Sequence, residues 1–524
     1  MASIFVVFYP LFTGYQDFLY WDDWDYIVLH DGVKGLSWDH LKWIMTSKTL
    51  GVYEPISRLI KNIVYFFFSL SPRAFQLTGL FFHTANGFLM WAISVALFRH
   101  IWPSRSRMVI IVAGFFSALF FAIHPLRAEV VAWVSAQAYA VSTCFVLLGI
   151  GCYIQHRQQE KEGSKWYWLT LGAYVCACMS KTVGIILPCL LVGLDYFPFR
   201  RHSAWKSIVE KWPFWITAFI FGSLAMWATH GAQPDGAIVL TFTQKIGRAS
   251  YSIFFYIINA FWPRDLLAHY QIPVKELSMF NPTYFMAFLG CVGVTVLSWV
   301  KRHQWPWLVV LWGAYIVTLL PVLGIVQHGA LWMSADRYTY ISLLGLSLVV
   351  GSSLLFINQI KWHIGMGAVV LSFVIGLGIH AVPQVKTWQN TETVWQNVLR
   401  VNPDNTMALN NLGFYYLRFR EYDKAEPLLK WGVELEPGHI KMALNYGMLL
   451  ERQDKVEEAI EALKRSIAFL PQAAFVYYNL GIMNSQLGKE VESQYYFTKA
   501  YRINPRLDEA IGSLQHLHDG VTLR

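Results

Sequence analysis

The sequence is poor in charge, and this shortage narrows the classes of protein to which it can belong. Only 14% of the 524 residues are charged, whereas about 25% is usual for soluble proteins. Hydrophobic residues make up 55% of the chain and aromatic residues 16%. This composition excludes a disordered chain, a soluble enzyme and a disulfide-stapled secreted module. A multi-pass membrane protein is the class that remains.

Other absences remove whole types of chemistry. The six cysteines all lie inside apolar segments, so we interpret them as packed thiols and not as disulfides or a metal site. No Walker loop, G-x-S-x-G or H-E-x-x-H motif occurs, which takes support from ATP hydrolysis and zinc proteolysis. The net charge of +9 comes without a basic stripe or a stacking platform. Nucleic acid is therefore not an expected partner.

The charges are unevenly distributed, and they divide the chain into parts. Residues 1–386 carry 43 charged side chains, whereas the remaining 138 residues carry 32. We therefore predict a membrane domain over 1–386, a half repeat or linker over 387–405, and a soluble repeat domain over 406–524. The predicted fold class is all-α, a polytopic transmembrane helix bundle followed by a helical solenoid.

Apolar segments of about 20 residues predict the membrane spans. The first, at 2–13, covers only roughly 20 Å of a core about 30 Å thick, so either the gene begins further upstream or this helix is tilted. Segment 248–262 is ambiguous, and we place it along the outer face because every cationic short loop then lies in the cytoplasm. About eleven spans, a cytoplasmic N-terminus and extracytoplasmic repeats follow; a twelve-span alternative puts the repeats in the cytoplasm. The other predicted spans are 74–98, 108–123, 129–153, 166–180, 182–197, 212–229, 282–300, 305–326, 337–357 and 362–383.

Glycine and proline recur every 34 residues in the last part of the chain, which is the period of tetratricopeptide repeats. Three full repeats are predicted over about 406–507, and residues 508–518 are expected to form a capping helix. Such stacks present a groove that binds polypeptide, so we expect one extended segment as the ligand; a rigid spacer is the alternative. The recurring residues are Gly413, Gly447 and Gly481, and Pro403, Pro437, Pro471 and Pro505.

Three acids follow the first span in an aromatic-rich stretch: Asp22, Asp23 and Asp25. Carboxylates beside a membrane are costly to desolvate and usually pair with a cation or take part in chemistry. Asp22 or Asp23 is therefore a candidate base for an acceptor hydroxyl. Asp23 and Asp25 also have the spacing of a pair that binds a divalent metal such as Mg²⁺ or Mn²⁺. A solvated loop with aromatic anchors is the alternative.

Charged residues also occupy predicted outer turns, where the positive-inside bias disfavours cations. We expect His124, Arg127, Lys181 and Arg337 to hold a phosphate, and Glu129 is a further candidate catalytic acid. Helix capping is the alternative for Glu129, and snorkelling to the interface is the alternative for Lys181 and Arg337. Acids and cations at one membrane face suit a lipid-phosphate substrate, because the cations hold the leaving phosphate while an acid activates the nucleophile.

Four strings together with the repeats resemble the transmembrane and tetratricopeptide-repeat proteins of the GT-C glycosyltransferase superfamily, particularly their bacterial members. The ordered set is specific, although each string alone is weak. The strings are W-D-D-W at 21–24, H-P-L-R-A-E-V-V-A-W at 124–133, L-P at 187–188 with L-D-Y at 194–196, and A-D-R-Y-T-Y at 335–340.

The resemblance implies a transferase that uses a polyprenyl-phosphate sugar at the outer or lumenal face; eukaryotic relatives O-mannosylate proteins. It places the catalytic acid in the first outer loop, on Asp22 or Asp23, and implies inverting attack of a Ser/Thr hydroxyl on the sugar C1. We expect transfer of a mannose-like hexose to an exported protein at the bacterial inner membrane, with the repeats presenting the acceptor. A glycan transferase acting on lipid or polysaccharide, and a non-enzymatic membrane-anchored scaffold, are the alternatives.

One stretch departs from the family pattern. Relatives often carry charged residues after the Val-Ala-Trp-Val sequence, whereas residues 135–142 of this chain carry none. If those charges contact the donor, this protein has a changed donor or reduced activity. The stretch is the main argument for the scaffold alternative.

Overall fold

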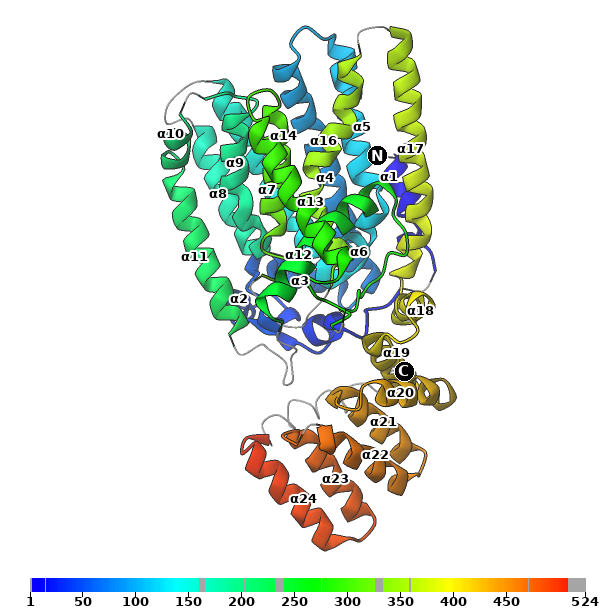
Figure 1. Cartoon of the computed structure of the whole chain (residues 1–524). Coiled ribbons are helices and arrows are strands. Elements are labelled where there is room, and N and C mark those ends of the chain that lie inside the picture. The colour runs from blue at the N-terminus through cyan, green and yellow to red at the C-terminus, as the bar shows by residue number, and fades with distance from the viewer. Residues whose placement is uncertain are drawn as a thin grey trace. The chain divides into compact units, whose positions relative to one another are not determined.

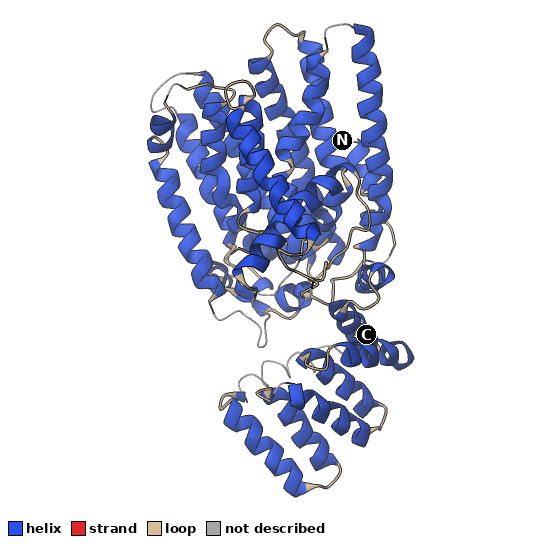
Figure 2. Ribbon diagram, in the orientation of Figure 1, coloured by secondary structure: helices blue, strands red, loops and turns tan. Residues whose placement is uncertain are grey.

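The structure is a computed structural model, and it describes residues 2–14, 16–159, 165–201, 203–230, 240–274, 276–325, 333–357, 360–469 and 471–507. The chain divides into two compact units, Met1–Asn390 and Thr391–Arg524. Every regular element in these ranges is a helix and none is a strand (Figure 2). The all-α fold class is confirmed. The predicted capping helix at 508–518 lies outside the described residues.

The first unit is a bundle of long helices joined by short 3₁₀ and π turns (Figure 1). Helices α2 and α3 lie at one end of this bundle, and the turn from α4 to α5 lies at the other. The α-helices are α1 Ala2–Val7, α2 Trp38–Thr46, α3 Pro55–Phe68, α4 Pro72–Ile101, α5 Arg107–Ile123, α6 Ala128–Ala132, α7 Ala138–Gln158, α8 Lys165–Ser180, α9 Leu187–Tyr196, α10 Ala204–Val209, α11 Trp212–Thr229, α12 Phe242–Phe261, α13 Pro282–Val300, α14 Pro306–Leu319, α15 Thr339–Ser342, α16 Leu344–Ser352 and α17 Ile360–Thr387. The short turns are η1 Tyr9–Phe12, η2 Trp24–Val28, η3 Asp31–Val33, η4 Thr49–Gly51, η5 Pro125–Arg127, η6 Val134–Gln137, η7 Thr182–Ile186, η8 Asp336–Tyr338 and η9 Ser353–Phe356.

Five helices of the described ranges are long and apolar enough to cross a membrane, so the chain is a membrane protein. They are Pro72–Ile101, Val134–Gln158, Trp212–Thr229, Pro282–Val300 and Ile364–Thr387. Two bent pairs raise the number to seven if each pair is one span: Arg107–Ile123 with Pro125–Ala132, and Asp336–Ser342 with Leu344–Phe356. Two shorter apolar helices, Thr182–Tyr196 and Pro306–Leu319, add to these, whereas α12 is not among them. Eleven spans therefore stays a prediction.

Local sequence explains where the long helices begin. The Ser71 hydroxyl accepts a hydrogen bond from the N–H of Ala74 at the start of α4, and Pro72 occupies the first helical position. Ser106 caps α5 in the same way through the N–H of Val109. These caps satisfy backbone donors that the first helical turn leaves unpaired. Chain breaks between the spans are therefore set by a few residues.

Helix α3 has its polar face inside the protein and its apolar face outside. Ser57, Arg58, Lys61 and Asn62 are buried, whereas the side chains of Ile63 and of residues 66–68, all phenylalanine, are exposed. This orientation is the reverse of a helix on a soluble protein. It suits a helix that faces lipid on one side and a polar interior on the other.

The second unit is a row of helical hairpins. Helices α19, α21 and α23 contact one another in sequence, and the Asn445 amide of α21 donates to Asn410 of α19 (2.9 Å). A Cβ at Gly413 or Gly481 would lie 2.6–2.7 Å from the facing helix, so glycine permits the close approach. Each second helix ends two residues before a repeated proline. The helices are α18 Thr391–Val401, α19 Thr406–Arg418, α20 Tyr422–Leu435, α21 Ile440–Arg452, α22 Val456–Phe469, α23 Ala474–Gln486 and α24 Glu490–Ile503.

Candidate functional site

The carboxylate of Asp23 is buried and is held by the segment that follows Trp133. Its Oδ1 accepts hydrogen bonds from the backbone N–H (2.9 Å) and the hydroxyl (2.5 Å) of Ser135, and its Oδ2 accepts one from the N–H of Leu19 (3.2 Å). Burial raises the pKa of Asp23 to about 6, although these hydrogen bonds oppose the rise. A carboxylate has about four acceptor positions. The three donors therefore leave one position, on Oδ2.

The two neighbouring acids lie in different surroundings. Asp22 is half-buried, and its negative charge adds to the raised pKa of Asp23. Asp25 lies in η2 and is exposed. Within the described ranges, no group of three or more His, Cys, Asp or Glu side chains is arranged to hold a metal ion. The metal pair of Asp23 and Asp25 therefore still rests on sequence spacing alone.

Lys181 is paired with a carboxylate that the sequence analysis did not single out as a site residue, Glu54. The Lys181 ammonium lies 2.9 Å from Oε2 of Glu54, and the Tyr26 hydroxyl donates to Oε1 (3.1 Å). Burial by itself would raise the pKa of Glu54, but the positive charges of Lys181, Lys61 and Arg58 outweigh it and lower that pKa. Glu54 is therefore an ionised group inside a cationic environment.

Lys61 is a further cation beside Glu54, and the sequence analysis did not identify it as a site residue. It is buried, and its Nζ has no hydrogen-bond partner among the residues that the structure describes. The Nζ lies 4.4 Å from the centre of the Tyr26 ring. Burial, together with the positive charges of Lys181 and Arg58, lowers the pKa of Lys61 to about 8, although Glu54 and Asp23 oppose the shift. Helical spacing on one face of 55–68 was the signal that could have found it.

Glu129 and Arg337 join the two bent helix pairs through the shorter member of each pair. The bends are 59° and 58°. The guanidinium of Arg337 donates to Oε1 of Glu129 (2.5 Å), and the backbone N–H of Arg337 donates to Oε2 (2.6 Å). Both side chains are largely buried. Glu129 therefore accepts its bonds from the other bent pair, which the capping interpretation did not anticipate.

The side chains of His124 and Arg127 are in hydrogen-bond contact with other groups of the protein. His124 Nε2 lies 2.9 Å from the carbonyl oxygen of Ala260. Arg127 donates from Nε to the carbonyl of Phe121 (3.1 Å) and from Nη1 to the hydroxyl of Thr339 (3.3 Å). Both are fully buried. In this arrangement they hold the bent helices together, and no described contact joins them to Asp23 or Lys181.

Residues of the uncharged stretch 135–142 connect these groups. Ser135 binds Asp23, and the Ser142 hydroxyl donates to the carbonyl of Lys181 (3.3 Å). The Lys181 ammonium lies 5.5 Å from the centre of the Tyr139 ring, which is 6.3 Å from the ring of Tyr338 next to Arg337. The stretch therefore supports both the acid and the cation, without carrying a charge. We call Asp23, Glu54, Lys61, Glu129, Lys181 and Arg337 the site cluster.

Arg248 is another buried cation that the sequence analysis passed over. It lies on α12, and its Nε has no hydrogen-bond partner among the described residues. Its guanidinium interacts electrostatically with Tyr338 and Tyr256. A Cβ at Gly324 would lie 2.1 Å from its Nη1, so the arginine is packed against bare backbone. Arg248 thus reaches the same tyrosine, Tyr338, as Arg337 does.

Three stacked indoles support the acid from the other side. The rings of Trp21 and Trp133 are 4.5 Å apart and nearly parallel, and Trp133 stacks on Trp388 at 5.7 Å. Trp21 precedes Asp22, and Trp133 lies two residues before Ser135. Stacking of large rings fixes the backbone on both sides of the Asp23–Ser135 contact.

A second buried charge cluster lies at the α10 end of the bundle, away from α2 and α3 (Figure 1). Asp195 accepts hydrogen bonds from Tyr153 (2.8 Å), Ser207 (2.5 Å) and Lys211 (2.5 Å), and it pairs with Arg157 (2.9 Å). Lys211 also donates to the carbonyl of Ser207 (2.9 Å). We call Tyr153, Arg157, Asp195, Ser207 and Lys211 the anchor cluster, since it joins α7, α9 and α10 to the start of α11.

Comparison with known proteins gives relatives of the kind that the motifs predict. No protein-family profile matches the chain. The chain is 20% identical over 479 residues to protein O-mannosyl-transferase TMTC3 of Mus musculus, covering 80% of this chain and 48% of that protein. It is 26% identical over 186 residues to protein O-mannosyl-transferase TMTC4 of Homo sapiens, covering 33% and 25%. The chain thus spans about half the length of the first of these relatives.

Among solved structures, ArnT from Cupriavidus metallidurans bound to undecaprenyl phosphate aligns with 90% of this chain and 79% of its own, at 15% identity and a TM-score of 0.37. The similarity to TMTC3 extends over four fifths of the sequence. It confirms the resemblance predicted from the four strings and the repeats: the chain is TMTC-like in sequence.

Proposed function

We propose that the protein is a membrane glycosyltransferase that moves a mannose-like hexose from a polyprenyl-phosphate donor to Ser or Thr of an exported protein. The observation that carries the proposal is a buried excess of cations beside the carboxylate of Asp23. Arg58, Lys61 and Lys181 act on Glu54, and Lys61 also acts on Asp23. Lys61 has no acceptor among the described residues. Buried charge of this kind calls for an anion. The names of the relatives support the choice of sugar and acceptor.

Asp23 is the favoured base, with Asp22 as the alternative. A pKa of about 6 makes the Asp23 carboxylate a competent proton acceptor near neutral pH. Asp23 takes the proton of the acceptor hydroxyl through the remaining position on Oδ2. The hydroxyl oxygen then forms a bond to the sugar C1 while the bond from C1 to the phosphate oxygen breaks, with inversion at C1. The phosphate leaves with the electron pair of that bond.

The leaving phosphate is assigned to Lys61, Lys181 and Arg337, with Arg248 beside them. Lys61, Arg248 and Arg337 are buried and Lys181 is half-buried, and each comes from a different part of the chain. Ammonium and guanidinium groups stabilise charge that develops on a departing phosphate, particularly where water is excluded. His124 and Arg127, which the sequence also assigned to the phosphate, are placed one step back, as supports of the bent helices. A Mg²⁺ or Mn²⁺ ion at Asp23 and Asp25 stays a prediction from their spacing.

The repeats are proposed to present the acceptor polypeptide, because their first helices α19, α21 and α23 lie in a row and such rows bind extended chains. We place the N-terminus in the cytoplasm and the repeats outside the bacterial inner membrane, following the distribution of cationic loops.

The test replaces Asp23 and Asp22 singly by Asn and measures hexose marks on exported proteins in strains that carry each variant. Loss of a general base costs about 10²–10⁴ in rate, so marks are expected to vanish in Asp23→Asn. Asp39→Asn is the matched control, since Asp39 is an exposed acid of the same loop. Wild-type marks in both variants would show that neither acid is the base.

The same comparison separates the alternatives. If the marks vanish only when the whole protein is deleted, the chain acts as a scaffold, which the uncharged stretch 135–142 favours. If no protein mark changes in any strain, the acceptor is a lipid or polysaccharide, and lipid-linked glycans become the readout.

A further inference from the structure

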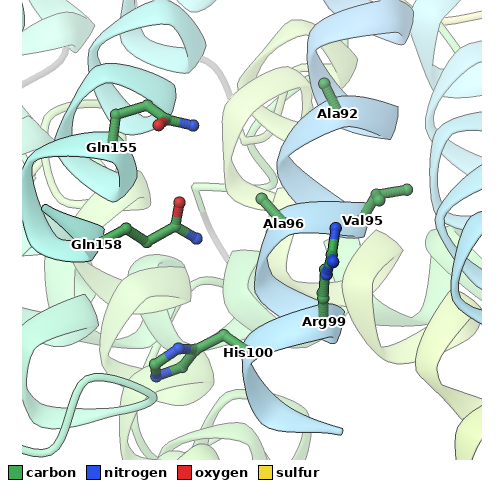
Figure 3. A pocket seen from close by; sticks show the side chains of 7 residues that line it. All are labelled: Ala92, Val95, Ala96, Arg99, His100, Gln155 and Gln158. Atoms are coloured by element: carbon green, nitrogen blue, oxygen red, sulfur yellow. The ribbon is translucent and has the colours of Figure 1, made fainter. Parts of the chain in front are cut away.

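A cavity of about 540 Å³ lies between α4 and α7, remote from the site cluster. Its lining is split in two: one part is apolar, and the other is cationic and amide-rich (Figure 3). No acid is among the described residues that line it. The lining residues are Ala92, Val95 and Ala96 on the apolar side, and Arg99, His100, Gln155 and Gln158 on the polar side.

The polar side lies at the C-terminal ends of both helices. Arg99 and His100 are in the last turn of α4, and Gln158 is the last residue of α7. Figure 3 shows the two glutamine side chains extending from α7 toward α4. Arg99 is exposed and makes no hydrogen bond or ion pair with any residue that the structure describes. A free guanidinium, an imidazole and two amides form a set of donors suited to a phosphate.

The apolar side continues along both helices toward the middle of the bundle. On α4, the exposed side chains of Phe81 and Phe88 lie on the same helical face as Ala92 and Arg99, at spacings of seven, four and seven residues. On α7, a Cβ at Gly151 would meet no atom within 4 Å. The two helices run in the same direction (Figure 1), and Gly151 lies four residues before Gln155, on the same face of α7. The cavity is therefore continued by an apolar surface along α4 and by open space at Gly151, which together we call the groove.

We propose that this cavity binds the head group of an anionic phospholipid, whose acyl chain follows the groove along Ala92 and Gly151. The cavity lies at the end of the bundle where cationic loops are found, and basic pockets between helices at such an end suit anionic head groups. A phosphodiester matches the donors, and the groove matches an acyl chain. The proposal is independent of the transferase activity: Gln137 of the stretch 135–142 donates to the carbonyl of Phe75 (2.8 Å), and about 36 Å of helix separates Phe75 from Arg99.

The experiment uses the full-length protein, reconstituted in vesicles of phosphatidylcholine with a minor fraction of phosphatidylglycerol. Lipids retained by the protein are counted by native mass spectrometry after gentle release. Wild type is expected to retain one phosphatidylglycerol. Arg99→Ala is expected to weaken retention about fivefold, because one cation near the surface contributes about 1 kcal/mol; adding His100→Ala should remove it.

Two further variants separate the ligand sources. Gly151→Leu fills the groove without a change of charge, so it should also displace the lipid. The variant should fold, because a Cβ at this position meets no atom within 4 Å. Arg107→Ala is the matched control, because Arg107 is an exposed cation at the same end outside the cavity; it should retain the lipid as wild type does.

Other results would overturn the proposal. Equal losses of retained lipid in Arg99→Ala and Arg107→Ala would mean that general surface charge, and not the cavity, holds the lipid. Competition by inorganic phosphate, with Gly151→Leu unaffected, would mean a site for free phosphate. Failure of wild type to retain phosphatidylglycerol would mean that no anionic lipid binds there.

Discussion

The site cluster and the anchor cluster are both buried and charged, and they differ in how completely their groups are bonded. In the anchor cluster, Asp195 has five partners, Arg201 included, and Lys211 has three acceptors. In the site cluster, Lys61 has no hydrogen-bond acceptor among the described residues, and Asp23 keeps one open position. Buried polar groups are nearly always satisfied, so an unsatisfied one calls for an explanation. We therefore expect the anchor cluster to stabilise the fold and the site cluster to bind an anion.

The largest effect is expected from Lys211→Met in the anchor cluster. Breaking a buried pair by removing one partner leaves the other charge uncompensated and costs about 3–5 kcal/mol. The change should lower the thermal midpoint of the reconstituted protein strongly. Lys206→Met, which removes an exposed cation of the neighbouring helix α10, is the control and should unfold like wild type. A stable Lys211→Met variant would break the comparison.

Lys61→Met should do the opposite: keep stability and lose transfer. Lys61 forms no ion pair with any residue in the described ranges, so the free energy of unfolding should stay level or rise slightly. Removing one donor to a developing oxyanion costs about 10²–10³ in rate. The measurement is transfer from a polyprenyl-phosphate hexose, alongside a thermal melt. The exposed Lys42→Met is the control; unchanged transfer in Lys61→Met would remove this residue from the site.

The pH dependence sharpens the same contrast at Asp23. Because its folded pKa, about 6, is above the ordinary value of 3.8, the unionised form is favoured by folding. Transfer should therefore fall as pH drops through about 6, by about tenfold per unit below it. The contribution of Asp23 to stability should rise over the same interval, from about pH 6 down to about pH 4, by about 3 kcal/mol in total.

Melts and transfer rates across this interval, for wild type and Asp23→Asn, measure both trends. The variant should lack the stability rise. Parallel movement of stability and activity in wild type would contradict the assignment of Asp23.

The sequence was sufficient for elements whose signals are local. Each predicted apolar segment coincides with one or more helices, and the 34-residue period located the hairpins, because glycine contacts and proline stops are set within one repeat. Charges at the ends of apolar runs also pointed to Asp23, Glu129, Lys181 and Arg337. All four belong to the site cluster, although their catalytic roles stay proposals.

The sequence was insufficient where a group's meaning depends on a distant partner. Glu54 is 127 positions from Lys181, and nothing near it marks the pair. Ser135 is an ordinary residue until Asp23 is placed beside it. His124 and Arg127 have the right chemistry for a phosphate, but the bend at residue 124 turns them toward backbone carbonyls. The bends themselves carry no pattern that would separate them from ordinary turns.

The inverted polarity of α3 gives the site a solvent requirement. In water, the hydrophobic effect would favour a rotation of α3 about its axis that buries the phenylalanines at 66–68 and exposes Arg58 and Lys61 to solvent. In lipid the same rotation would place two cations against hydrocarbon, so the present orientation is the favourable one. The arrangement around Glu54 therefore depends on the bilayer as well as on the protein. In a detergent that covers the apolar face of α3 poorly, the contacts around Glu54 should be lost before the rest of the bundle unfolds.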